Sequence, residues 1–255
     1  MNSDLRKKIV EIIFAAGEGH IPSSLSIVDI VHHIYDKVMN YQKKETKDFF
    51  ILSKGHGCVA LYAVLNKFKL ISDKVLSSYS RNGGILGGHP DSTKVKSIVA
   101  STGSLGHGFP MGVGIALGLK IKNKNNKVLI LLGDGECQEG TIWESANIAA
   151  NRKLDNICAI VDWNGSAAQL MPIDKLVKKW AAFGWDVKVI NGHSKKDFQK
   201  YLTRKIFNNS NKPKVFLAKT IKGKGIKFME GHGIWHHKIP SKEQFHHILK
   251  ILEKK

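Results

Sequence analysis

The stretch V-L-I-L-L-G-D-G-E-C-Q-E-G, residues 128–140, decides the fold that we expect for this chain. It opens with five apolar residues, the composition of a strand that is buried on both faces. Two glycines around Asp134 follow at once. The next apolar run, residues 157–161, leads into D-W-N-G-S at residues 162–166. Alternation of such strands with helical patterns predicts an α/β fold, with a parallel sheet covered by helices on both faces.

Apolar runs and 3.6-residue periodicity predict the other elements. Strands are expected at residues 49–52, 128–132, 157–161, 187–190 and 215–219. A first helix should follow Ser3 or Asp4 and end near Gly17 and Gly19, and a second should follow Ser24 or Ser26. Further helices are expected at residues 56–68, 105–119, 143–151, 173–183 and 196–207, with a last one capped by Ser241 and running to about residue 252. Residues 81–104 are rich in Gly, Ser and Thr and predict a long functional loop.

The helix expected at residues 105–119 contains five glycines. Glycine costs a helix interior about 1 kcal/mol relative to alanine. Such a helix therefore indicates that another backbone, a ligand or a partner chain must come very close to it.

Composition is that of a globular protein, with 42% hydrophobic and 24% charged residues among 255. Without an internal repeat or linker, residues 1–255 are expected to form one domain. No apolar run approaches the ~20 residues of a membrane span, and the N-terminus lacks a signal-peptide pattern. The three cysteines, at positions 58, 137 and 158, have no metal-binding spacing. These features predict a cytoplasmic location with reduced thiols.

The charge of the chain is unusual. It has 40 Lys and Arg residues but only 21 Asp and Glu residues, which gives a formal net charge of +19. The basic residues are spread along the chain, and aromatic residues are not interleaved with them as in proteins that stack bases. This distribution favours an anionic small molecule or an acidic partner subunit over nucleic acid or a membrane.

Polar residues follow two of the predicted strands. In open α/β sheets, ligands bind beyond the carboxyl ends of the strands. Asp134 and Asn164 should meet there and offer the oxygen ligands that Mg²⁺ or Ca²⁺ prefers. An ordinary pair of turns, where Gly, Asp and Asn are common, explains these residues equally well.

Histidines and lysines give two further signals. Five histidines occupy loop-like positions suited to proton transfer or substrate binding, namely His20, His56, His89, His107 and His236. Zinc is a weaker interpretation, because no C-x-x-C pair occurs. The pairs at 32–33 and 246–247 fall on predicted helices and are expected at the surface. K-G-K-G at residues 222–225 follows the last strand, an arrangement that is suited to binding phosphate. It lacks the residue spacing of a P-loop.

Taken together, the motifs are more specific than any one of them. In order they are G-H (19–20), S-K-G-H-G (53–57), G-H-P (88–90), S-T-G-S-L-G-H-G (101–108), G-D-G (133–135) with Asn164, and K-G-K-G (222–225) with W-H (235–236). This series resembles the thiamine-diphosphate-binding half of transketolases, over essentially the whole chain.

The resemblance implies a role for each matching residue. Mg²⁺ would be held by Asp134, Asn164 and the Ser166 carbonyl. Residues expected to bind thiamine diphosphate are Ser23, His56, Gly103, Ser104, Leu105, Gly135, Glu136, Asn164, Lys222 and His236. The expected catalytic residues of the substrate channel are His20, His89 and His236. Glu139 matches the interface carboxylate that links paired active sites.

Two departures from the family pattern shape the functional expectation. Residues 166–169 look shortened, which puts the usual sugar-phosphate substrate in doubt. The resemblance also implies that the pyrimidine-binding and C-terminal domains, and with them the family's activating glutamate, belong to another chain. We therefore expect the N-terminal subunit of a two-chain transketolase that moves a two-carbon ketol unit from a ketose to an aldose. It would act only with its partner subunit, as an α₂β₂ heterotetramer.

Two alternatives stay open at this point. The chain could be a subunit of another thiamine-diphosphate enzyme, one similar to deoxyxylulose-phosphate synthase or an acyl-transferring enzyme. It could also be a non-catalytic basic binding protein that keeps the fold.

Overall fold

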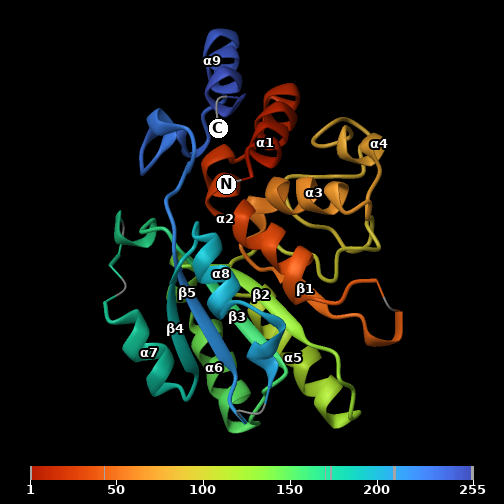
Figure 1. Ribbon diagram of the computed structural model, residues 1–255, viewed down its shortest axis with the longest axis vertical. Coiled ribbons are helices and arrows are strands. Elements are labelled where there is room, and N and C mark those ends of the chain that lie inside the picture. The colour runs from red at the N-terminus through yellow and green to blue at the C-terminus, as the bar shows by residue number, and fades with distance from the viewer. Residues whose placement is uncertain (1, 43, 170, 173, 209–210, 254–255) are drawn as a thin grey trace.

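Five parallel strands form one sheet, in the order β1-β2-β3-β5-β4 (Figure 1). Their bounds are Phe49–Leu52, Val128–Gly133, Ile157–Trp163, Asp186–Asn191 and Lys214–Lys219 for β1 to β5. The computed structural model describes residues 2–42, 44–169, 171–172, 174–208 and 211–253. All five predicted strands are confirmed. Strands β2 and β3 are almost completely buried, whereas most residues of the edge strand β4 are exposed.

Helices cover both faces of this sheet. Successive side chains of a strand point to opposite faces, so Leu129 and Leu131 of β2 enter one core while Val128, Ile130 and Leu132 enter the other. The first core is closed by α1 (Ser3–Ala16), α2 (Ile21–His33), α3 (Cys58–Lys67), α8 (Lys195–Tyr201) and α9 (Lys242–Glu253). The second is closed by α5 (Gly108–Ile121), α6 (Gly140–Asn151) and α7 (Leu176–Ala182). The predicted α/β fold class is therefore correct.

Several predicted helix boundaries differ from those in the structure. Helix α2 begins at Ile21 rather than after Ser24 or Ser26, because Pro22 is preorganised for a first helical turn. The expected helix at 196–207 is α8 followed by a 3₁₀ turn at Arg204–Phe207. A 3₁₀ turn at Gly55–Gly57 precedes α3, and the short α4 (Asp73–Leu76) was not predicted. Residue 173, where we expected α7 to begin, lies outside the described residues.

Helix α5 begins three residues later than expected, and its close packing explains part of its glycine content. Gly106 has a φ of +80°, which an α-helix cannot contain. A Cβ on Gly108 would lie 2.7 Å from the Ser53 Cα, and one on Gly112 would lie 2.3 Å from Ile130 Cδ1. The prediction that another backbone comes close is thus confirmed at Gly108, within this chain itself. A Cβ on Gly114 would meet nothing within 4 Å.

The first and last helices lie against each other (Figure 1). Phe14 of α1 stacks on Phe245 of α9 with ring centroids 4.0 Å apart. Ser241 caps α9 as predicted, because its hydroxyl accepts a hydrogen bond from Gln244 N while Gln244 Oε1 accepts one from Ser241 N. In the part of the chain that the structure describes, no helix has the length and apolar character to cross a bilayer.

Substitution of the two α5 glycines tests this packing. Gly112→Ala should destabilise the protein by about 1–3 kcal/mol relative to Gly114→Ala, because only the first forces a methyl group against a buried side chain. Both variants gain the same helix propensity, so the difference isolates the packing. Urea unfolding of the two variants measures it, and equal stabilities would contradict the close packing of α5 on β2.

Candidate active site at the carboxyl edge of the sheet

Asp162 joins four separate segments at the carboxyl end of β3. Its side chain is fully buried and accepts hydrogen bonds from Ser26 Oγ at 2.8 Å and Asn164 Nδ2 at 2.8 Å. Lys54 Nζ and Thr220 Oγ1 also donate to it. Burial raises the pKa of Asp162, but the Lys54 charge and the hydrogen-bond donors outweigh it and hold that pKa below its ordinary value. The segments after β1, β3 and β5 are thus fastened to α2 at one carboxylate.

The expected metal ligands lie beside this carboxylate. Because the Asn164 amide nitrogen donates to Asp162, its oxygen is the atom left to accept, and it takes a hydrogen bond from Ser166 N at 2.9 Å. Asp134 accepts from Gly135 N at 2.8 Å and from Gly165 N at 2.7 Å. Burial and the Asp162 charge raise the pKa of Asp134, which shows that its carboxylate would gain from a nearby cation. Asp134 and Asn164 are therefore brought to one place, as the parallel register predicts.

A cavity of about 790 Å³ opens next to these groups, within the size range of ligand sites. It collects most of the residues that the sequence singled out, namely His20, Ser23, His56, His89, Gly103, Leu105, Asp134, Gly135, Glu136, Asn164, Ser166, Lys222 and His236. Three others do not line it. Ser104, His107 and Glu139 are exposed outside the cavity.

Glu136 lines the cavity, but its carboxylate is occupied by protein groups. It accepts hydrogen bonds from Gly106 N at 3.0 Å and Gly133 N at 3.2 Å, and from the Ser53 hydroxyl. Burial raises its pKa against the effect of these donors. Glu136 thus fixes the backbone at Gly106 and Gly133.

Four histidines reach the cavity from different segments. His20 precedes α2, His56 lies in the 3₁₀ turn Gly55–Gly57, and His236 ends the 3₁₀ turn Ile234–His236. His89 lies in the long loop, where Tyr62 Oη donates to its carbonyl at 2.8 Å and Gly103 leaves room for its ring. The long loop therefore brings the His89 side chain to the cavity.

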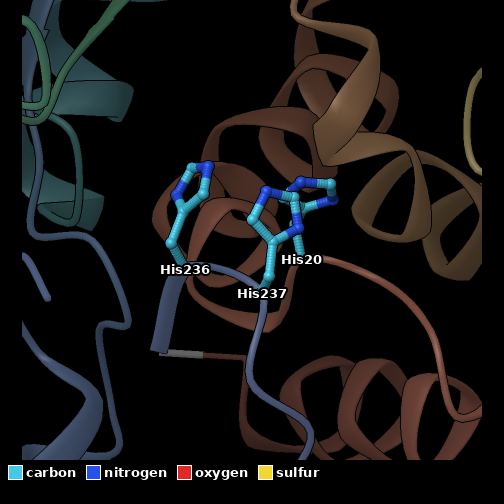
Figure 2. A group of neighbouring side chains, drawn as sticks. All are labelled: His20, His236 and His237. Atoms are coloured by element: carbon cyan, nitrogen blue, oxygen red, sulfur yellow. The ribbon is translucent and has the colours of Figure 1, made fainter. Parts of the chain in front are cut away.

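Figure 2 shows His20, His236 and His237 close together, and all three line the cavity. The ring centroid of His20 is 5.3 Å from that of His236 and 4.2 Å from that of His237. Burial and the neighbouring histidines lower the pKa of His20 to about 4, and burial and Lys222 lower that of His236 to about 4. Neutral imidazoles can accept as well as donate protons, so the group suits hydroxylated ligands.

The ligand nitrogens of these three histidines lie within 4.8 Å of one another, which raises the question of a transition metal. However, Lys222 Nζ lies 2.5 Å from His236 Nδ1 and donates to it, so its ammonium charge stands where a cation would bind. The hydrogen bond also places the proton of His236 on Nε2. The cluster is better suited to a polar substrate than to zinc.

Some cavity residues were missed by the sequence analysis. Lys54, His232 and His237 also line the cavity. Lys54 stood within the quoted S-K-G-H-G motif, and His237 adjoins His236, so both had a local signal. The expectation of a surface position is wrong for His33, which is buried and meets the Leu202 carbonyl through Nε2 at 2.8 Å. All three cysteines are free and buried.

Residues 1–244 match the family described as "Transketolase, thiamine diphosphate binding domain". This chain belongs to that family. The match covers the sheet, the long loop and every residue that lines the cavity. The predicted family and its thiamine-diphosphate-binding fold are thus confirmed.

Two relatives are similar over nearly their whole length. The chain is 38% identical to an apulose-4-phosphate transketolase subunit of Phocaeicola vulgatus, over 96% of this chain and 90% of that protein. It is 35% identical to 6-deoxy-6-sulfo-D-fructose transketolase subunit SqwG of Clostridium sp. strain MSTE9, over 98% and 94%. Both relatives are named as subunits.

Longer transketolases match over part of their length. The solved structure of transketolase from Campylobacter jejuni superposes with a TM-score of 0.86 at 26% identity, over 98% of this chain and 41% of that one. Human transketolase is 34% identical over 96% of this chain and 40% of its own length. The present chain therefore spans about two fifths of these proteins.

The effect of acid on the stability of the fold should reveal that His56 is held in its neutral form. Burial and Lys54 lower the pKa of His56 from 6.5 to about 2, so below pH 6.5 the unfolded chain binds a proton that the folded chain refuses. Stability conferred by the neutral ring is present above pH 6.5 and is lost as the pH falls from there towards 2. Between pH 7.5 and 5, His56→Gln should lose up to about 2 kcal/mol less stability than the unchanged protein.

Urea unfolding at the two pH values measures this difference. His246→Gln, at an exposed position of α9, is the matched control and should follow the unchanged protein. An equal loss in all three proteins would show that His56 is not held neutral by its surroundings.

Proposed function

We propose that this chain is the cofactor-binding subunit of a two-chain transketolase, which moves a two-carbon ketol unit from a ketose to an aldose. The observation that carries the proposal is that one cavity gathers Asp134, Asn164, Lys222 and six histidines. Relatives of the same length that are named as transketolase subunits support the division into two chains.

The residues present fit magnesium and thiamine diphosphate. A buried carboxylate with a raised pKa, an amide oxygen oriented by Asp162 and a main-chain carbonyl are hard oxygen donors of the kind that Mg²⁺ prefers. Asp134, Asn164 and Ser166 would supply them, and Lys222, Ser23 and His56 would face the diphosphate. When bound, thiamine diphosphate supplies the carbanion that accepts and releases the ketol unit.

This chain's own residues would bind the substrate and move protons. His20, His89 and His236 come from three segments and surround the cavity, so they can hydrogen-bond several hydroxyl groups of one sugar. Because the ring of His20 is neutral near pH 7, it can take a proton from a hydroxyl and return it. His236 accepts from Lys222 through Nδ1, so its Nε2–H would donate a hydrogen bond to a substrate oxygen. The family match and these cavity residues favour catalysis over a non-catalytic basic protein.

Sugars with an anionic end group are the substrate class that we propose. The two subunit relatives are named for a sugar phosphate and a sulfo sugar, respectively. The formal charge of +19 on this chain would attract either type of substrate. Ser166 and Ala167 of the shortened loop line this cavity, so this loop is where specificity for one sugar would be set.

The partner would carry the pyrimidine-binding and C-terminal domains. Glu139 is exposed at the start of α6, where its Cβ packs beside Gly106, so a partner chain can reach it. An α₂β₂ assembly in the cytoplasm, with each active site at an interface, completes the proposal. The alternative is that the chain is a subunit of another thiamine-diphosphate enzyme. An activity assay with ketose and aldose substrates would distinguish the two.

Removal of the central carboxylate tests the metal site. Asp134→Ala should weaken magnesium-dependent binding of thiamine diphosphate about 100-fold or more, since loss of a direct ligand exceeds the usual effect of an outer one. Calorimetric titration at fixed Mg²⁺ measures the affinity. Asp186→Ala, at the exposed start of β4, should bind as the unchanged chain does. Equal affinity of the Asp134→Ala variant would remove Asp134 from the metal site.

Activity should depend on a second polypeptide. The purified chain, supplied with thiamine diphosphate, Mg²⁺ and ketose and aldose phosphates, should transfer no ketol unit. The reason is that the acid that activates the aminopyrimidine in this family belongs to the partner's domain. Co-purification with the product of a neighbouring reading frame that encodes a pyrimidine-binding domain should restore transfer. Robust transfer by the chain alone would refute the two-chain proposal.

A further inference from the structure

Lys222 depends on a tightly folded loop, residues 221–225, that follows β5. The loop bonds through its backbone to distant segments, with Gly223 N donating to Pro22 O at 3.0 Å and Gly231 N donating to Lys222 O at 2.9 Å. A Cβ on Gly223 would lie 2.1 Å from the Met229 carbonyl oxygen. Small displacements of this loop therefore move the Lys222 ammonium within the cavity.

A histidine outside the cavity holds the first residue of this loop. His193 follows β4, and its side chain is 9% exposed. Ile221 N donates to His193 Nε2 at 2.9 Å, and His193 Nδ1 lies 3.2 Å from Asp29 Oδ2. One ring thus bridges a carboxylate of α2 and the residue next to Lys222.

These contacts settle the protonation of the ring. A backbone N–H can only donate, so Nε2 of His193 must be the accepting nitrogen. The proton of the neutral imidazole is then on Nδ1, from which it is donated to Asp29. Both nitrogens are used, and the ring has one orientation that satisfies them.

Asp29 is itself fixed, which makes the bridge rigid. Arg6 Nη1 and Nη2 donate to its two oxygens at 2.9 and 2.6 Å, and the side chains of both residues are almost completely buried. Arg6 Nε also donates to Lys224 O at 2.9 Å. A Cβ on Gly225 would lie 3.0 Å from Arg6, so this glycine allows the approach. The same ion pair consequently holds the loop on both sides of Lys222.

We propose that His193 is a positioning residue that fixes the loop 221–225, and with it Lys222, for the diphosphate group of the cofactor. The inference rests on the proposed function for the identity of the ligand. A side chain outside the cavity would thus set cofactor affinity through one hydrogen bond from Ile221 N.

Substitution of the full-length chain at position 193 tests the proposal. His193→Ala should speed amide hydrogen exchange at Ile221 at least about tenfold and weaken magnesium thiamine diphosphate binding about tenfold, the effect of roughly one lost hydrogen bond. His193→Gln should recover much of both effects, because its side-chain oxygen can accept from Ile221 N. Exchange is measured on the chain without ligand, and affinity by calorimetry with magnesium thiamine diphosphate.

His33→Ala is the matched control, because it removes a ring from the same neighbourhood. His33 lines a cavity with His193 but bonds the Leu202 carbonyl rather than the loop. It should lower thermal stability and leave Ile221 exchange and cofactor affinity unchanged. Unaltered Ile221 exchange in His193→Ala, or an equal loss of affinity in both variants, would overturn the proposal. Failure of the unchanged chain to bind thiamine diphosphate would instead contradict the proposed function, and the exchange result would still decide whether His193 holds the loop.

Discussion

The buried ion pair between Lys54 and Asp162 is the interaction on which the site depends. Both side chains are almost completely excluded from water. Asp162 also accepts hydrogen bonds from Ser26, Asn164 and Thr220. A buried charge is costly unless it is paired and hydrogen-bonded, so these segments must meet for the protein to fold. Three of these segments follow β1, β3 and β5 and the fourth is α2, so folding itself assembles the walls of the cavity. Asn164, which we propose as a metal ligand, is oriented by the same carboxylate.

The fold could be predicted largely because burial leaves a direct mark on the sequence. Strands of a parallel sheet that is covered on both faces are apolar runs, and 128–132 and 157–161 were recognisable as such. Helix boundaries were less accurate, since they depend on local backbone geometry. Pro22 starts α2 ahead of the serines that looked like caps, and the left-handed backbone at Gly106 delays α5.

The candidate site could be predicted in part. Asp134 and Asn164 were found because carboxyl ends of adjacent parallel strands share one edge, and the histidines because they flank glycines in loops. The role of Asp162 as the shared hydrogen-bond acceptor was missed, because its partners lie up to 136 residues away in the sequence and only tertiary contacts reveal them. His193 was missed for the same reason, since its two partners belong to α2 and to the loop after β5.

The coupling between Lys54 and Asp162 tests this account most directly. Unfolding free energy and magnesium thiamine diphosphate affinity are to be measured for Lys54→Met, Asp162→Asn and the double variant. We predict that Asp162→Asn costs about 3–5 kcal/mol, since it leaves the Lys54 charge unpaired, and that the double variant regains much of that loss. Cofactor binding should stay impaired in the double variant, because the loops lose their common anchor. Additive stability effects together with normal cofactor binding would contradict the account.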